Sequence, residues 1–182
     1  MKERSCETHL VLINHVWSKA LNAGLQVDAV FLDFAKAFDR VNRKILLHKL
    51  CNFGISGSLQ AWCGDYLSNR KQRVVINGKC SSWLNITSGV PQGSILGPLF
   101  FVIFISDLPE VVSQESSVAL YAYDCKAFRV VNCPNDLMMF QDDLDSLFTW
   151  SQQNRTTFNV KKCKLMCITQ KKQPFRSSFT LN

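Results

Sequence analysis

Apolar residues recur at three- and four-residue steps in several parts of this chain. This is the spacing of a helix that packs one face against a core. The pattern predicts five helices, at residues 8–22, 43–51, 59–67, 94–107 and 135–153. Four acidic side chains of the last helix are expected on its solvent-facing side; they are Asp136, Asp142, Asp143 and Asp145.

Runs of apolar, β-branched residues predict the strands. Residues 27–34 are nearly all apolar, which is typical of a strand covered on both faces. Asn77-Gly78 separates residues 73–76 from 83–86, and this dipeptide favours a hairpin turn because both of its residues adopt positive φ. A final strand is predicted at residues 164–169.

A second hairpin is predicted around Tyr123-Asp124, which lies between the apolar residues 117–120 and 125–128. The resulting order of strands and helices, read after the first helix, is β, α, α, ββ, α, ββ, α, β. That order predicts an α+β fold with an antiparallel sheet covered by helices on one face.

Composition places the chain among globular proteins and adds a hint about its partner. Of its 182 residues 47% are hydrophobic and 19% are charged, which is too apolar for a disordered chain and is typical of one domain. The formal net charge of +7 favours a polyanionic partner. Basic residues concentrate in 70–79 and 161–176. A solvated basic surface is the alternative reading of those clusters.

The cysteines do not form a recognisable metal or disulfide pattern. None of the eight stands in a Cys-x-x-Cys pair, and the three histidines lie far in the sequence from the closely spaced Cys163 and Cys167. The first fifteen residues lack the apolar core of a signal peptide. The longest apolar run, 99–105, is far shorter than the ~20 residues of a membrane span. We therefore expect reduced thiols in an intracellular protein, nuclear or cytoplasmic, without a membrane segment.

Two aspartates stand where predicted strands begin or end. Asp33 lies at the end of the strand at 27–34, Asp124 lies in the second hairpin, and the glycine-rich loop 88–94 lies between them in the sequence. Carboxylates that converge from neighbouring strands are the ligands that two-metal phosphoryl transfer requires. An isolated Asp at a strand end more often forms an Asx turn, which is the simpler alternative.

Four segments decide between these readings by their content and order. They are Phe31-Leu32-Asp33-Phe34-Ala35-Lys36-Ala37-Phe38-Asp39, residues 88–100, Tyr121-Ala122-Tyr123-Asp124 and residues 144–166. Together they resemble the palm of the reverse transcriptases of LINE-type non-LTR retrotransposons, of the jockey and CR1 kind. The resemblance implies a palm-like sheet with part of the fingers. It also implies an RNA-directed DNA polymerase that uses two Mg²⁺ ions, dNTPs, an RNA template and a DNA primer.

The resemblance also assigns roles to individual residues. Asp33 and Asp124 would bind the metal ions. The nucleotide pocket would be lined by Phe34, Phe38, Gln92 and Gly93, with Phe38 as the steric gate. Residues implied to contact nucleic acid or the triphosphate are Arg70, Lys71, Arg73, Lys162 and Lys164, and the choice among Lys161, Lys162 and Lys164 for the triphosphate stays open.

One position departs from the family pattern. Tyr123 stands where the family has the first Asp of its aromatic-Ala-Asp-Asp block. A phenol is neutral at neutral pH and is a poor Mg²⁺ ligand. We therefore expect this copy to be catalytically inactive. We also expect residues 1–182 to be a single-domain fragment of a longer enzyme, with palm and part of the fingers but no thumb.

Three functions are compared on this basis. The first is the polymerase, the second is a non-catalytic nucleic-acid-binding remnant, and the third is an unrelated α+β structural protein, which the order of motifs argues against. A carboxylate at position 123 would permit catalysis, whereas Tyr123 favours binding alone. The sequence gives no sign of a protein partner.

Overall fold

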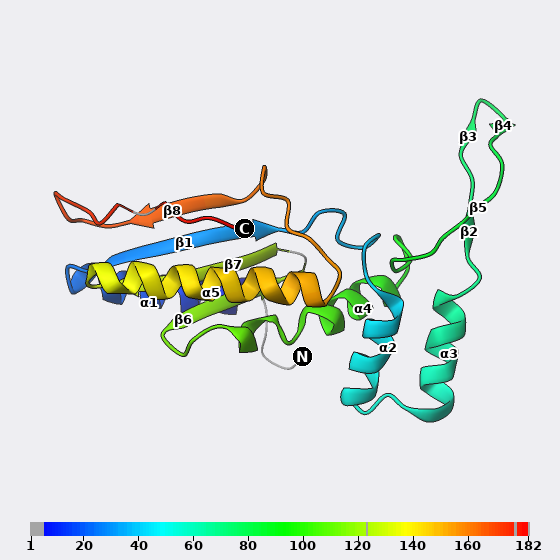
Figure 1. Ribbon diagram of the computed structural model, residues 1–182, viewed down its shortest axis with the longest axis horizontal. Helices are drawn as coiled ribbons and strands as arrows, with labels where there is room; N and C mark the ends of the chain where they lie inside the picture. Colours follow the sequence, from blue (N-terminus) through cyan, green and yellow to red (C-terminus); the bar gives the residue numbers. More distant parts are fainter. Residues whose placement is uncertain (1–5, 123, 177, 182) are drawn as a thin grey trace. The chain divides into compact units, whose positions relative to one another are not determined.

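The computed structural model describes residues 6–122, 124–176 and 178–181 (Figure 1). The chain forms two compact units. The first unit comprises the described residues of Met1–Ala35, Asp107–Gln153 and Thr157–Asn182, and the second comprises Lys36–Ser106 and Asn154–Thr156. The single domain expected over residues 1–182, with palm and part of the fingers, stays a prediction.

A four-stranded antiparallel sheet forms the centre of the first unit. Its strands lie in the order β6 (Ser116–Tyr121), β7 (Asp124–Val131), β1 (Gln26–Asp33) and β8 (Lys164–Ile168). The hairpin predicted around residue 123 joins β6 to β7, with Tyr121 opposite Asp124. The predicted strands at 27–34 and 164–169 are confirmed within one residue at each end.

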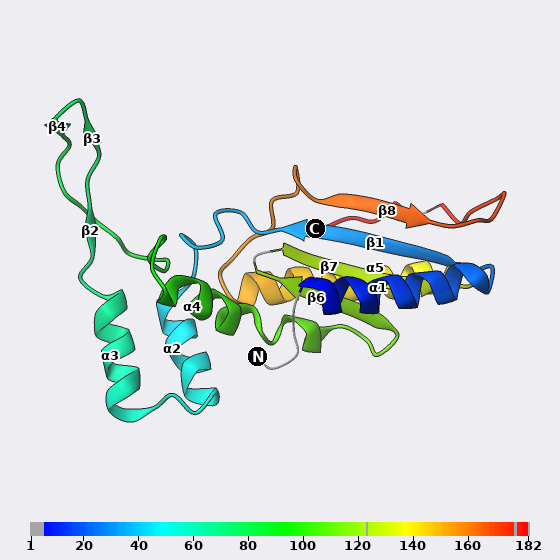
Figure 2. The same ribbon diagram turned by 180° about the vertical axis from the view of Figure 1, so that it is seen from behind.

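Two long helices cover this sheet, α1 (Cys6–Asn22) on one face and α5 (Pro134–Gln153) on the other (Figures 1 and 2). Ile13 of α1 belongs to a buried cluster with Val27 and Ala29 of β1. A short 3₁₀ helix, η1 (Leu108–Val111), precedes β6. The α+β class and the antiparallel sheet are confirmed. The structure differs in one respect, because helices lie over both faces of the sheet and not over one. Side chains on both faces of β1 are buried, so each face packs against a helix.

The acidic residues of α5 were expected to face solvent, and for Asp143 this is wrong. Asp143 is buried because its carboxylate accepts hydrogen bonds from the Ser113 backbone N–H, at 2.7 Å, and from the Ser113 hydroxyl, at 2.8 Å. The buried Arg129 of β7 lies 3.6 Å from the same carboxylate. A buried carboxylate is tolerated where a cation and donors compensate it, and these partners come from other elements.

Three helices make up most of the second unit: α2 (Arg43–Asn52), α3 (Gly57–Leu67) and α4 (Leu96–Ile105). The Asn42 side chain caps α2, accepting hydrogen bonds from the backbone N–H groups of Lys44 and Ile45. Lys49 of α2 is buried, and its ammonium donates to the carbonyl of Phe104 at 2.7 Å. The three predicted helices are confirmed, with ends shifted by up to two residues.

The remaining part of the second unit is a hairpin of four very short strands. β3 (Val75–Ile76) pairs with β4 (Lys79–Cys80) across the predicted turn, where Asn77 and Gly78 both have positive φ. β2 (Lys71–Gln72) pairs with β5 (Leu84–Asn85) further along. The turn is confirmed, but its direct partners are residues 75–76 and 79–80, since the two-residue loop brings the flanking residues together first.

Candidate functional site

The carboxylates of Asp33 and Asp124 come from neighbouring strands. Asp33 ends β1, Asp124 begins β7, and the two residues are directly opposite each other in the antiparallel register. Directly opposed residues project from the same face of a sheet, with Cα atoms about 4.5–5.5 Å apart. The hairpin therefore brings together the two aspartates that the sequence singled out. Tyr123 lies outside the described residues.

Both aspartates line a pocket of about 830 Å³ in the first unit. Its apolar wall includes Leu10 and Ile13 of α1 and Phe31 of β1. Four lysines also line it, and they were not all expected there: Lys126, Lys161, Lys162 and Lys164. With two carboxylates and four ammonium groups the pocket is positive, which suits a ligand that carries several negative charges.

A tight turn brings Lys162 to Asp33. The Asn159 backbone N–H donates to the Asp33 carbonyl at 2.7 Å, and the Lys162 N–H donates to the Asn159 carbonyl at 2.8 Å. The Lys162 ammonium then lies 3.3 Å from Oδ2 of Asp33. That oxygen is buried and makes no well-directed hydrogen bond. The contact is therefore an ion pair with an exposed lysine, and it leaves the oxygen free to accept a stronger ligand.

Lys126 is the pocket residue that sequence reasoning missed most clearly. It lies two residues after Asp124 on β7, so both side chains project from the same face of the sheet. Its ammonium lies over the rings of Trp17 and Phe31, 5.2 and 4.8 Å from their centroids. Burial lowers the pKa of Lys126. The alternation of side chains along β7 could have identified Lys126, since every second residue after Asp124 projects from the same face of the sheet as Asp124.

Phe34 was expected to line the nucleotide pocket. The position of its side chain does not support that expectation. The ring is 4% exposed and packs against Phe158, with centroids 4.9 Å apart, and against Trp150. Alternation explains the placement, because the residue after Asp33 must project from the opposite face of the strand. Phe34 is thus a core residue of the first unit.

In the second unit, the loop at residues 88–92 is bound tightly to residues 38–41. The Val90 backbone N–H donates to the Phe38 carbonyl at 2.8 Å, and the Gly89 N–H donates to the Val41 carbonyl at 2.9 Å. A Cβ on Gly89, whose φ is +84°, would lie 2.7 Å from the Phe38 carbonyl oxygen. Only glycine fits there, because the two backbones approach too closely for any side chain.

This contact places three of the predicted nucleotide-pocket residues in the second unit. Phe38 is half-buried and stacks on Phe101, with ring centroids 5.3 Å apart. The Gln92 side chain is exposed and donates to Oδ1 of Asp39 at 3.1 Å. Gly93 has a φ of +76° in the turn that precedes α4. Their contact with a nucleotide stays a prediction.

The predicted nucleic-acid contacts fall into two groups. Lys162 and Lys164 line the pocket with the aspartates, and Lys164 begins β8 opposite Phe31 of β1. Lys71 and Arg73 are exposed on the hairpin of the second unit, whereas Arg70 at its base is half-buried. Burial, followed by the charge of Arg70, lowers the pKa of the neighbouring Arg43.

The side chains around Asp33 and Asp124 can be compared with the ligands that a divalent cation requires. Within the described ranges, no three His, Cys, Asp or Glu side chains are grouped so that they could hold a metal ion. Two opposed carboxylates do lie together, and Mg²⁺ is commonly bound by one or two carboxylates with substrate phosphates and water completing its shell. The pair therefore fits a substrate-assisted Mg²⁺ site and does not fit an all-protein cage.

Sequence comparison identifies the family. The profile of the family "Reverse transcriptase (RNA-dependent DNA polymerase)" matches residues 3–177. The chain belongs to the reverse transcriptase family. Members of this family generally use divalent metal ions.

Curated relatives place the domain among the reverse transcriptases of non-LTR retrotransposons. It is 33% identical over 143 residues to the RNA-directed DNA polymerase from mobile element jockey of Drosophila melanogaster, covering 73% of this chain and 15% of the relative. It is 28% identical over 162 residues to the Pol polyprotein from the R2 element of Popillia japonica, covering 85% of this chain and 27% of the relative. The chain thus spans only 15% and 27% of the length of these two relatives.

Solved structures show the same fold. An apo telomerase from Candida tropicalis, truncated from its C-terminal domain, superposes with a TM-score of 0.65 at 14% identity, over 92% of this chain and 35% of the telomerase chain. At that identity the likeness concerns the fold alone, and it confirms a palm-like α+β architecture. Among the described helices, none has the length and apolar character needed to cross a membrane.

Proposed function

We propose that this domain is the palm region of an RNA-directed DNA polymerase, in which deoxynucleotides are transferred to a primer 3′-hydroxyl. The observation that carries the proposal is the opposition of Asp33 and Asp124 in one pocket. Two like charges directly opposite each other destabilise a sheet. Such a pair therefore lowers the stability of the fold unless a cation compensates the charges. A divalent ion is the compensating partner that polymerase chemistry supplies.

In this proposal Asp33 and Asp124 hold Mg²⁺ at the end of the sheet. When bound, Mg²⁺ would activate the primer hydroxyl and neutralise charge on the triphosphate. The protein's own contribution is placement, since strand register fixes both carboxylates before substrate arrives. Lys162 and Lys164 add positive charge around the same pocket and would attract the triphosphate.

We propose Phe38, Gln92 and Gly93 as the nucleotide-contacting residues. The bonding of the loop at 88–92 to residues 38–41 supports this, because Gln92 donates a hydrogen bond to Asp39, the residue that follows Phe38. Phe34 is left out of the proposal, since its ring is buried against Phe158.

The polyanionic partners are proposed to be an RNA template and a DNA primer. The charge of +7 and the basic hairpin support this assignment. A fold neighbour, the telomerase from Candida tropicalis, has been solved in complex with a fragment of telomeric RNA. Arg70, Lys71 and Arg73 are the proposed backbone contacts in the second unit.

We further propose that this copy is catalytically defective because Tyr123 replaces a metal-binding carboxylate. A missing ligand worth about 4 kcal/mol at the transition state lowers the rate about a thousandfold. The experiment is a graft of this domain into a complete non-LTR reverse transcriptase, assayed for primer extension on an RNA template. The graft should be inactive and Tyr123→Asp should restore extension. Extension by the unmutated graft would refute the assignment of Tyr123.

Metal binding tests the carboxylate pair without relying on activity. Mn²⁺ titration of the isolated chain, followed by electron paramagnetic resonance, should reveal a weak site that is lost in Asp33→Asn and in Asp124→Asn. Tyr123→Asp should bind Mn²⁺ more tightly, because it adds a carboxylate to the pair. A Mn²⁺ affinity unchanged in all three variants would place the metal elsewhere. Nucleic-acid binding that persists without Mn²⁺ binding would favour the non-catalytic alternative.

A further inference from the structure

The hairpin of the second unit is exposed along its whole length. From Lys71 to Asn85 every residue is exposed, and the base is closed by the Ile86 backbone N–H donating to the Arg70 carbonyl at 2.8 Å. An isolated two-stranded hairpin is at best marginally stable in water. A segment of this kind gains most when another molecule packs against it.

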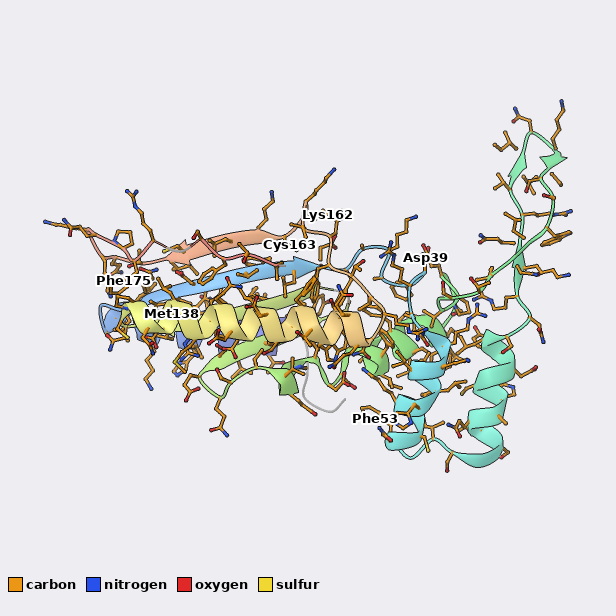
Figure 3. The ribbon with its side chains drawn as sticks, in the orientation of Figure 1. Asp39, Phe53, Met138, Lys162, Cys163 and Phe175 are labelled. Carbon is orange, nitrogen blue, oxygen red and sulfur yellow. The ribbon has the colours of Figure 1, made fainter. Side chains whose placement is uncertain are left out.

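The charge of the hairpin is entirely positive. Residues 70–86 contain four basic side chains, Arg70, Lys71, Arg73 and Lys79, and no acidic one. Nitrogen-tipped side chains project from the hairpin along both strands (Figure 3). A partner that complements this surface must be negatively charged.

Beside these charges lies an exposed aromatic ring. The guanidinium carbon of Arg73 lies 4.6 Å from the centroid of the Trp83 ring. The Trp83 side chain nevertheless remains 57% exposed. Arg73 therefore covers part of the ring and leaves a large apolar surface facing solvent. An exposed indole of this size next to an arginine plane is a surface on which a nucleobase can stack.

We propose that Trp83 and Arg73 form a base-stacking platform for single-stranded nucleic acid, with Arg70, Lys71 and Lys79 contacting its phosphates. This inference rests on the proposed function and deepens it, because it assigns to the hairpin a contact with nucleic acid in which bases stack on a side chain without sequence preference. A duplex buries its bases, so the platform acts on unpaired nucleotides. An acidic protein surface would satisfy the charges but would not require the bases, and this difference allows a test.

Two probes of equal length and charge separate stacking from electrostatics. One is a fluorescein-labelled twelve-nucleotide oligothymidine, and the other is the same backbone with abasic sites throughout. By fluorescence anisotropy, the chain should bind the oligothymidine about tenfold more tightly than the abasic strand. Trp83→Leu should abolish this preference without changing the salt dependence of binding. Trp83→Phe should keep most of it, because phenylalanine still offers a stacking face.

Trp62 provides a matched control. It lies on α3, is 52% exposed and stacks on Tyr66. Trp62→Leu removes a tryptophan of similar exposure outside the hairpin and should leave the preference for bases intact. Lys71→Gln should weaken the binding of both probes and reduce the slope of log affinity against log salt by about 0.7, the value for one phosphate contact on a single strand.

Equal binding of both probes by the wild-type chain would overturn the platform, as would a base preference that survives Trp83→Leu. Asp33→Asn distinguishes failure of the platform from failure of the proposed catalytic site. It should remove Mn²⁺ binding while leaving the preference for oligothymidine over the abasic strand intact. Absence of a base preference in a wild-type chain that still binds Mn²⁺ would therefore refute the platform alone.

Discussion

The ammonium of Lys162 lies 3.3 Å from the carboxylate oxygen Oδ2 of Asp33, a buried oxygen that accepts no hydrogen bond from the residues that the structure describes. The lysine side chain is 68% exposed and that of Asp33 is 25% exposed. An ion pair whose cation is largely exposed contributes little stability, so this lysine is easily displaced. Lys162 can therefore serve as a provisional counter-ion for Asp33, one of the two opposed carboxylates.

Removing this charge should strengthen metal binding. At 3.3 Å two unit charges in water interact by about 1 kcal/mol, which corresponds to about fivefold in affinity. Lys162→Met should raise Mn²⁺ affinity about fivefold, measured by electron paramagnetic resonance at low salt. Lys161→Met is the charge-matched control, since Lys161 lines the same pocket. Equal gains in Mn²⁺ affinity in the two variants would mean that the total positive charge of the pocket, and not the contact between Lys162 and Asp33, opposes metal binding.

Substitution of Gly89 should damage the second unit. A Cβ there would lie 2.8 Å from both Cα and the carbonyl oxygen of Asp39, with φ at +84°. The left-handed conformation and the clash together should cost about 2–5 kcal/mol in Gly89→Ala, read as a lower urea midpoint. Gly64→Ala is the control, because its Cβ would lie 3.6 Å from the nearest atom of Leu47. That variant should gain up to about 1 kcal/mol from helix propensity.

Much of the fold could be predicted because it depends on local pattern. The apolar run of β1, the Asn77-Gly78 turn and the stripe of α5 each determine their element from residues close in sequence. The opposition of Asp33 and Asp124 follows once both strands are antiparallel neighbours. Alternation alone also predicts that the side chain of Phe34 projects from the opposite face of the strand to that of Asp33.

What the pattern could not predict depends on partners distant in the chain. Asp143 has the spacing of a solvated acid, and only its contacts with Ser113 and Arg129 explain its burial. Lys162 reaches Asp33 through a turn anchored to the end of β1. Trp83 is apolar and would be assigned to a core by composition, yet the hairpin leaves it exposed.

The buried network around Arg129 should dominate the stability of the first unit. Asp143→Ala leaves Arg129, 3% exposed, without one of its carboxylates, and it removes the acceptor of two hydrogen bonds from Ser113. Breaking a buried pair from one side costs about 3–5 kcal/mol. Asp142→Ala, at the adjacent exposed position, should change the free energy of unfolding by less than about 0.5 kcal/mol. Similar urea midpoints for the two variants would contradict the assigned network.

Asp136 should make stability depend on pH at the start of α5. Its Oδ2 accepts hydrogen bonds from the backbone N–H groups of Asn132 and Cys133, at 2.9 and 3.0 Å, as a capping residue does. Burial alone would raise the pKa of Asp136, but these hydrogen bonds and the charge of Arg129 outweigh it and lower the pKa. The folded state therefore binds the proton less readily than the unfolded state does.

A carboxyl group with a lowered folded pKa contributes stability above its unfolded pKa, about 3.9, and that contribution is lost as pH falls through the folded value. Asp136→Asn should thus reduce the free energy of unfolding by about 1 kcal/mol at pH 7, the usual worth of a cap. The difference between wild type and variant should shrink as pH falls below about 4, because the unfolded chain takes up the proton first, and it should vanish once the pH is below the lowered folded pKa. Urea titrations at a series of pH values measure it, with Asp142→Asn as the control from the exposed side of the same helix. A difference that stayed constant down to pH 2 would show that the charge of Asp136 is not what stabilises the start of α5.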